Sequence, residues 1–188
     1  MQGSLVSNSE LIDFVAKRVI DIKPFEPERA QLAHYPLDPE TFFIRRGAEW
    51  VYAHSFARSQ RAFVVEANQY VVVEIRQHIA PGMGVVGMFV PSSNLIEQGL
   101  SLVAGKISYP FGQQNERIRF GLKNNIAEPC EIQPGDLVAY VQFFDLTQAK
   151  SVLYQLSERD MQIYEHRRRV ADDDSVWALQ NSDTDAPV

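Results

Sequence analysis

The chain has 188 residues, a hydrophobic content of 45% and a net charge of −6. A chain of this length can bury about 70% of its unfolded surface, so one domain with its own core is feasible. The negative charge makes a nucleic-acid partner unexpected, because duplex binding depends largely on Lys and Arg contacts to phosphates. We also expect no membrane partner, since no signal segment is evident and no apolar run approaches the ~18 residues of a membrane span.

The first predicted element is a helix that opens at Ser7. Ser7 and Glu10 have the spacing of a capping box, in which a hydroxyl and a carboxylate satisfy the free amides of the first turn. Apolar residues then recur at helical spacing, and we expect the helix to end near Arg18. Pro24 prevents a further helix directly after it.

Most of the following chain has the pattern of short strands, which are rich in β-branched and aromatic residues and separated by turn residues. The predicted strands cover residues 42–44, 49–54, 61–66, 70–75, 83–90, 100–107, 117–124, 130–132 and 137–144. We predict loops at 31–39 and 92–98, and turns at 81–82 and 133–136. No βαβ rhythm is visible, so the pattern favours a mainly β domain, a barrel or a sandwich.

The character of the chain changes after Asp145. A capping pattern and mixed charges predict a helix over residues 158–170, and the polar residues from 180 onward predict a disordered tail. We therefore divide the chain into a β domain with its N-terminal helix (1–150), a helical extension (151–178) and a tail (179–188).

Cys130 is the only cysteine, so an internal disulfide is excluded and a reducing compartment is the simplest setting. Because it lies among strand residues, we interpret Cys130 as a small core residue. A nucleophilic role would need a nearby base that the sequence does not indicate.

A set of short motifs occurs in a specific order along residues 5–144. It includes Pro91-Ser92-Ser93, Gln98-Gly99-Leu100, Ala104-Gly105-Lys106-Ile107, Phe120-Gly121-Leu122-Lys123-Asn124 and Pro134-Gly135-Asp136-Leu137-Val138. This order resembles the dCTP deaminase branch of the dUTPase superfamily. The resemblance implies a distorted β-barrel or jelly-roll-like domain that assembles as a homotrimer, with nucleotide pockets between subunits.

The chain departs from the family at the residues that carry chemistry. Pro91 stands in place of an Arg before the Ser-Ser turn, Ser108 in place of an Asp, and Gly121 in place of the deaminase Glu. Pro36-Leu37 replaces an Asp-Leu pair. Deamination needs a carboxylate that transfers protons, and cleavage of a triphosphate needs a base and cations on the phosphates. These departures remove the groups that the family uses for both reactions.

The remaining polar residues near these motifs are weak candidates for nucleotide binding: Ser92, Ser93, Asn94, Lys106 and Ser108. The alternative for residues 92–94 is a plain polar loop. Glu97 is a candidate for a relocated catalytic acid, with a solvated loop carboxylate as the alternative. The four histidines do not share metal-ligand spacing, and one cysteine cannot build the zinc cluster of cytidine deaminases. We expect no cofactor, and Mg²⁺ only if the chain is an enzyme.

Two functional hypotheses follow. The first is a catalytically silent, trimeric dUTPase-like module that binds a nucleotide or acts as a structural part of a protein assembly, for instance of a virion type. The second is a diverged dCTP deaminase or dUTPase that acts on deoxynucleoside triphosphates through Glu97. The expected location is cytoplasmic or otherwise intracellular, or within a virion.

Overall fold

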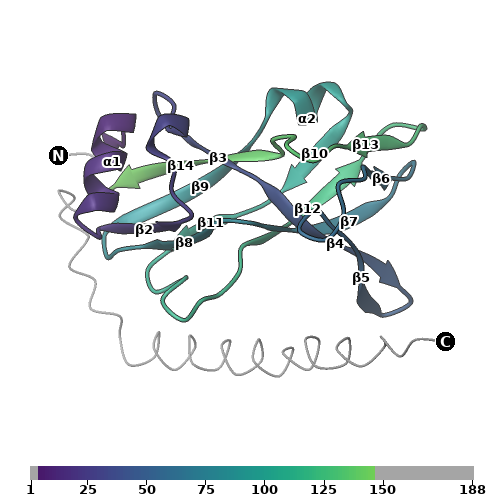
Figure 1. Ribbon diagram of the computed structural model, residues 1–188, viewed down its shortest axis with the longest axis horizontal. Helices are drawn as coiled ribbons and strands as arrows, with labels where there is room; N and C mark the ends of the chain where they lie inside the picture. Colours follow the sequence, from purple (N-terminus) through teal and green to yellow (C-terminus); the bar gives the residue numbers. More distant parts are fainter. Residues whose placement is uncertain (1–3, 147–188) are drawn as a thin grey trace. The chain divides into compact units, whose positions relative to one another are not determined.

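The computed structural model describes residues 4–146, which form mainly β-strands (Figure 1). The helices are α1 (Asn8–Ala16), α2 (Ser93–Glu97) and a 3-10 turn, η1 (Pro27–Arg29). The strands are β1 (Ser4–Leu5), β2 (Ile20–Lys23), β3 (Tyr35–Leu37), β4 (Pro39–Arg46), β5 (Glu49–Ser55), β6 (Phe63–Val65), β7 (Tyr70–Ile75), β8 (His78–Pro81), β9 (Val85–Pro91), β10 (Leu100–Val103), β11 (Lys106–Ser108), β12 (Arg119–Asn124), β13 (Cys130–Ile132) and β14 (Ala139–Asp145). None of the helices within residues 4–146 is long and apolar enough to cross a bilayer.

The strands are arranged in two five-stranded and two two-stranded sheets. One large sheet has the order β1-β14-β9-β11, with β3 also paired to β14, and the other has the order β10-β12-β7-β4-β5. The small sheets pair β13 with β6 and β2 with β8. The predicted mainly β, jelly-roll-like class is confirmed. Among the described residues the large sheets end in edge strands, so the strands do not close into a barrel.

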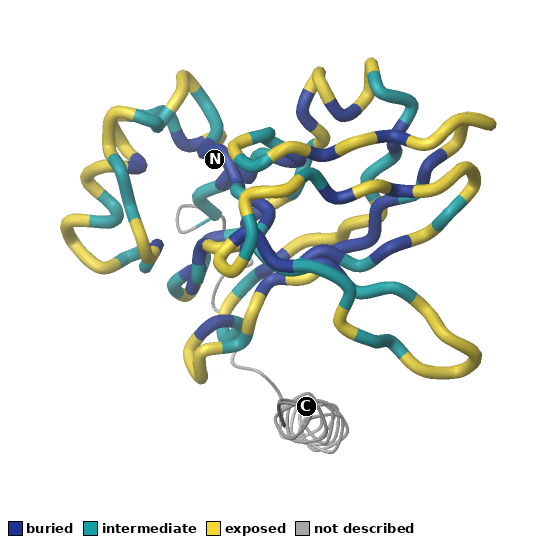
Figure 2. The backbone as a smooth tube through the Cα atoms, turned by 45° about the vertical axis from the view of Figure 1, so that its right-hand side comes forward, coloured by how far each residue is buried: buried dark blue, intermediate teal, exposed yellow. Residues whose placement is uncertain are grey.

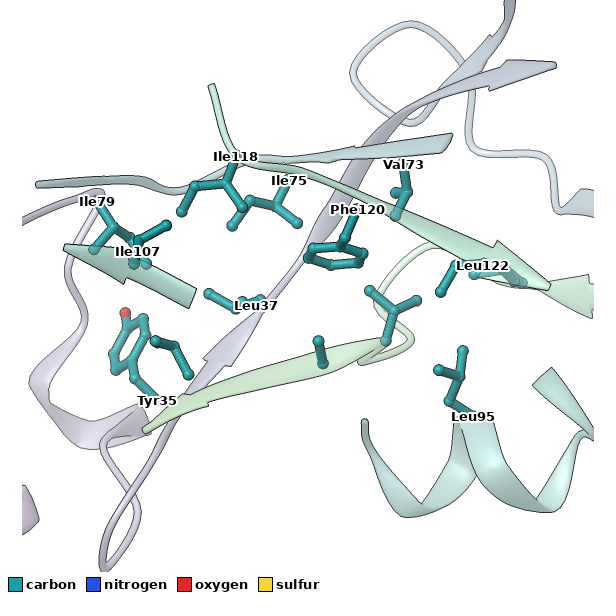
Figure 3. Close-up of a cluster of buried hydrophobic side chains, with 14 of the residues drawn as sticks. Tyr35, Leu37, Val73, Ile75, Ile79, Leu95, Ile107, Ile118, Phe120 and Leu122 are labelled. Atoms are coloured by element: carbon teal, nitrogen blue, oxygen red, sulfur yellow. The ribbon is translucent and has the colours of Figure 1, made fainter. Parts of the chain in front are cut away.

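The core lies between the two large sheets and follows the two-residue period of the strands. In β7, Val71, Val73 and Ile75 are fully buried, whereas the residues between them are half-buried. Figure 2 shows buried and less buried backbone alternating along the strands. The ring of Phe89 in the first sheet lies 5.9 Å from that of Phe120 in the second sheet. Figure 3 shows the buried side chains that fill this layer. Burial of this apolar surface is the main force that holds the sheets together.

The predicted N-terminal helix is confirmed together with its capping box. The backbone N–H of Ser7 donates to the Glu10 carboxylate at 2.8 Å, and the N–H of Glu10 donates back to the Ser7 hydroxyl at 3.4 Å. The helix ends at Ala16, and Arg18 just after it has a φ of 59°. The predicted turn at 133–136 is also confirmed, since Gly135 has the positive φ of 92° that a type II turn requires at this position.

Several expected loops and strands differ from the structure. The loop predicted at 31–39 contains β3 and the start of β4, and the loop predicted at 92–98 contains α2. The single strand predicted at 100–107 is divided at Ala104-Gly105 into β10 and β11, which belong to different sheets. Strand β8 was not predicted at all. The short β3 and β8 are specified by pairing with the distant β14 and β2, which local pattern does not encode. The helix predicted at 158–170, the tail and the extension lie outside the described residues.

Candidate functional site

The Ser-Ser turn follows β9 and begins α2. Ser92 is the N-cap of this helix: its hydroxyl accepts a hydrogen bond from the N–H of Leu95 at 3.2 Å and donates one to the carbonyl of Leu137. The side chain is 2% exposed, because it is buried between α2 and the segment before β14. Both bonds are internal, so this hydroxyl is already satisfied without a ligand. Ser92 is therefore the structural cap of α2.

The other candidates on this segment face solvent. Ser93 and Asn94 are exposed on the first turn of α2, and Glu97 is exposed at its last residue. Leu95 between them points into the core, where Figure 3 shows it near Leu122. The helix thus uses one face for packing and leaves the candidate acid in water, which is the environment of an ordinary surface carboxylate.

The candidates on β11 lie beside β9, which leads into the Ser-Ser turn. Lys106 is exposed opposite Met88 of β9, and Ser108 is half-buried opposite Val86. Ser92 follows Met88 by four residues and Val86 by six, which corresponds to about 13 Å and about 20 Å along an extended chain. The structure therefore places Lys106 and Ser108 on one short strand, with Ser108 the more distant of the two from the Ser-Ser turn.

Gly121 of β12 is covered by a tyrosine. Tyr70 of β7 lies directly opposite Lys123 of β12, and its ring reaches diagonally over Gly121. A Cβ built at Gly121 would lie 1.9 Å from the Tyr70 hydroxyl oxygen and 2.3 Å from the ring carbon that bears it. The ring of Trp50 lies 5.9 Å from that of Tyr70 on the same side. Any side chain at position 121 therefore requires the Tyr70 ring to move.

A row of apolar residues crosses the outward face of this sheet. The cross-strand register aligns Val103, Gly121, Val72, Phe43 and Tyr52 from β10 to β5. The exposed fractions of Val103 and Tyr52 are 51% and 41%, so the ends of the row are open to solvent. We call these five residues the outer row.

A polar cluster that the sequence did not indicate joins the η1 segment, the residue between β3 and β4, and the segment after β7. The Arg29 guanidinium donates to both oxygens of Asp38, at 2.6 and 2.7 Å, and Arg76 donates to Asp38 at 2.8 Å and to Glu26 at 3.2 Å. Gln77, which is fully buried, adds a further hydrogen bond to Asp38 at 2.8 Å. Burial opposes ionisation of Asp38, but hydrogen bonds from Arg29 and Gln77 outweigh it and lower the pKa of the carboxyl. The cluster pairs two cations with two anions, so it acts as an internal anchor.

Cys130 is a buried residue of the core. Cys130 is buried with its sulfur 2.9 Å from the Gln98 carbonyl oxygen, and burial raises the pKa of the thiol. Its interpretation as a core residue is confirmed. Within residues 4–146, no group of three or more His, Cys, Asp or Glu side chains could hold a metal ion.

Comparisons with known proteins support the fold. The deaminase of 2′-deoxycytidine 5′-triphosphate from Agrobacterium tumefaciens matches with a TM-score of 0.61 and 9% identity over 77% of this chain. The chain spans about half of that protein, since 49% of it is covered. The chain has a dUTPase-like fold.

Two dUTPases match with lower scores. The EIAV dUTPase has a TM-score of 0.43 and 11% identity over 67% of this chain and 98% of its own. A variant dUTPase of phage phi11 of S. aureus has a TM-score of 0.46 and 15% identity over 74% of this chain and 97% of its own. No known family profile matches the sequence, and no curated relative does.

Proposed function

We propose that this chain is a catalytically silent dUTPase-like module that assembles as a homotrimer and serves as a structural component of a protein assembly. The observation that carries the proposal is the arrangement at Gly121, where Tyr70 occupies the space next to the backbone. In the related deaminases a carboxylate is expected at this position. Here the position has no side chain, and its surroundings are aromatic.

The other candidate groups support the same conclusion. The hydroxyl of Ser92 is satisfied by two bonds inside the chain, and Glu97 lies in solvent at the end of α2. Proton transfer requires a positioned acid or base, and phosphate transfer requires cations aimed at the phosphates. Pro91 and Ser108 supply neither.

The outer row favours a structural role over nucleotide binding. Apolar and aromatic residues that are aligned across a sheet and partly open to solvent are typical of surfaces that contact protein. Tyr70 and Trp50 extend this surface beside the outer row. A homotrimer would cover part of it, and the partner in a larger assembly would then be protein.

Two measurements on the full chain test the proposal. Incubation with dCTP or dUTP and Mg²⁺ should release neither ammonia nor pyrophosphate above background. Light scattering should give three times the 21.4 kDa chain mass, about 64 kDa. Turnover that is lost in Glu97→Ala would establish the enzyme hypothesis instead. A monomer at micromolar concentration would contradict the proposed homotrimeric structural role.

A thermal-shift series separates the structural version from nucleotide sensing. A ligand with a micromolar Kd at millimolar concentration stabilises the folded state by about 4 kcal/mol, which is easily detected. We expect no shift with deoxynucleoside triphosphates. A clear shift would make the module a nucleotide-binding protein.

A further inference from the structure

A pocket of about 590 Å³ is lined by none of the candidate residues above. It is bounded by the end of α1, the outward face of the β2–β8 sheet and the segment 112–115 between β11 and β12. Figure 1 shows α1, β2 and β8 grouped together, on the side of the domain away from α2. Its volume is within the range of about 300–1,000 Å³ that is usual for small-molecule sites.

The floor of the pocket follows from the strand register. In the β2–β8 pair, Lys23 lies opposite His78, and Asp21 lies opposite Ala80. Ile22 and its neighbours on the other face are buried in the core. Alternation therefore directs the polar residues of both strands to the outward face, where they line the pocket.

The walls are fixed by close backbone contacts. The N–H of Gly82 donates to the carbonyl of Val19 at 2.7 Å, which joins the end of β8 to the segment after α1. Gly112 packs directly on β8, since a Cβ there would lie 2.4 Å from the carbonyl oxygen of Ile79. The pocket is thus formed by the fold itself and needs no rearrangement to exist.

The charge of the lining is opposite to that of the whole chain. Arg18, Lys23 and His78 line it together with a single acid, Asp21, whose carboxylate is paired with Lys23. Counting Arg18 and Lys23 against Asp21 leaves one positive charge, with the histidine neutral, on a chain whose net charge is −6. Gln113 and Asn115 of the facing segment add amide groups that can donate hydrogen bonds.

His78 gives an independent indication of a ligand. Its Nε2 atom is buried and has no hydrogen-bond partner among the described residues. Buried polar atoms in proteins are almost always paired, so such an atom needs an explanation. Among the described residues, the other buried ring nitrogen without a partner is Nε2 of His54. The His54 ring lies among phenylalanine rings, with its centroid 5.1 Å from that of Phe56. The His78 ring instead lines the pocket beside cations and amides, and a turn of this ring would bring its buried Nε2 atom to a bound group.

We propose that this pocket binds a small molecule through an oxyanion, either phosphate or carboxylate, held by Arg18, Lys23 and His78. Guanidinium, ammonium and imidazole N–H groups form charge-assisted hydrogen bonds to such anions, which are stronger than neutral ones. The amides of Gln113 and Asn115 contact the same ligand from the opposite wall. The site is independent of the proposed assembly function, because it shares no residue with the outer row or α2.

The test uses the full chain and two simple probes, pyrophosphate and citrate, each titrated at constant ionic strength and followed by calorimetry and by amide chemical shifts. Arg18→Asn removes the cation and suits the positive φ, because Asn tolerates this conformation. His78→Gln removes the imidazole but keeps a polar side chain. Lys17→Gln is the matched control, since Lys17 neighbours Arg18, is exposed and does not line the pocket.

We expect one probe to bind and to shift the amide signals of residues 15–23, 78–82 and 112–115. The probe that binds more tightly identifies the natural group as phosphate or carboxylate. Arg18→Asn and His78→Gln should each weaken binding about tenfold, whereas Lys17→Gln should leave it unchanged. The proposal is overturned if neither probe binds at about 10 mM. It is also overturned if Lys17→Gln weakens binding as much as Arg18→Asn, since the attraction would then be nonspecific. Neither outcome affects the light-scattering or turnover results.

Discussion

Replacement of Asp38 by Asn tests the internal anchor most directly. Asp38 accepts three hydrogen bonds from Arg29 and Arg76 and one from Gln77, and its side chain is only 18% exposed. The change keeps the shape but removes the charge that both guanidinium groups contact. A hydrogen bond to a charged group contributes about 1.5–3 kcal/mol, and the partial exposure of Arg76 reduces its share. We expect Asp38→Asn to lower the free energy of unfolding by about 2–4 kcal/mol.

Urea denaturation at pH 7 measures this loss, with Asp13→Asn as the control. Asp13 pairs with Lys17 at 3.5 Å, but both side chains are about two-thirds exposed. Surface pairs of this kind contribute at most about 1 kcal/mol, so the control should be close to neutral. If the two variants lose equal stability, the cluster does not anchor the fold and the reasoning from burial is wrong.

The stability difference between the wild type and Asp38→Asn should depend on pH. The folded-state pKa of Asp38 lies below its unfolded value, so the carboxylate stabilises the fold above the unfolded pKa of about 3.9. That contribution is lost as the pH falls through the lower, folded-state pKa. The stability difference between the wild type and Asp38→Asn should therefore be constant near neutral pH and shrink below pH ~4. A difference that stays constant down to pH 2.5 would contradict the assigned role of the charge.

Three further variants test other contacts. Gly112→Ala should cost about 2 kcal/mol or more in urea denaturation, because Gly112 has a φ of 81° and packs on the β8 backbone; a neutral result would show that this wall can shift. Ser7→Ala should lower stability by about 1 kcal/mol through loss of the capping box, and Ser7→Thr should restore most of it. In a double-mutant cycle, Gly121→Ala should be less costly in a Tyr70→Ala background by about 0.5–3 kcal/mol, and strict additivity would mean that the ring does not restrict position 121.

The parts of the fold that sequence predicted are those with local causes. The capping box at Ser7 and Glu10 defined α1, and Pro134-Gly135 defined a turn that needs a positive φ. The dense β-branched residues of β7 predicted a strand with the observed bounds. In each case the signal and the structure it specifies lie within a few residues of each other.

The parts that sequence missed depend on distant partners. Strand β8 exists because it pairs with β2, more than fifty residues earlier, and α2 is held by the bond from Ser92 to Leu137. The Asp38 cluster joins three segments, and the pocket at His78 joins α1 to the segment after β11. No local pattern encodes these contacts. Arg29 and Asp38 are both visible in the sequence, but nothing in it indicates that their side chains meet.

Two of the motif residues, Ser92 and Gly121, have structural roles that do not depend on a ligand. Ser92 caps α2 and ties it to the segment before β14, so a serine is useful here without any phosphate. Gly121 admits the ring of Tyr70 onto the sheet, and cross-strand packing of an aromatic ring over glycine stabilises a strand that glycine alone would weaken. Resemblance at such motifs is therefore evidence for a shared architecture. Evidence for activity must come from acids and cations, and the residues at positions 91, 108 and 121 are Pro, Ser and Gly, which are neither.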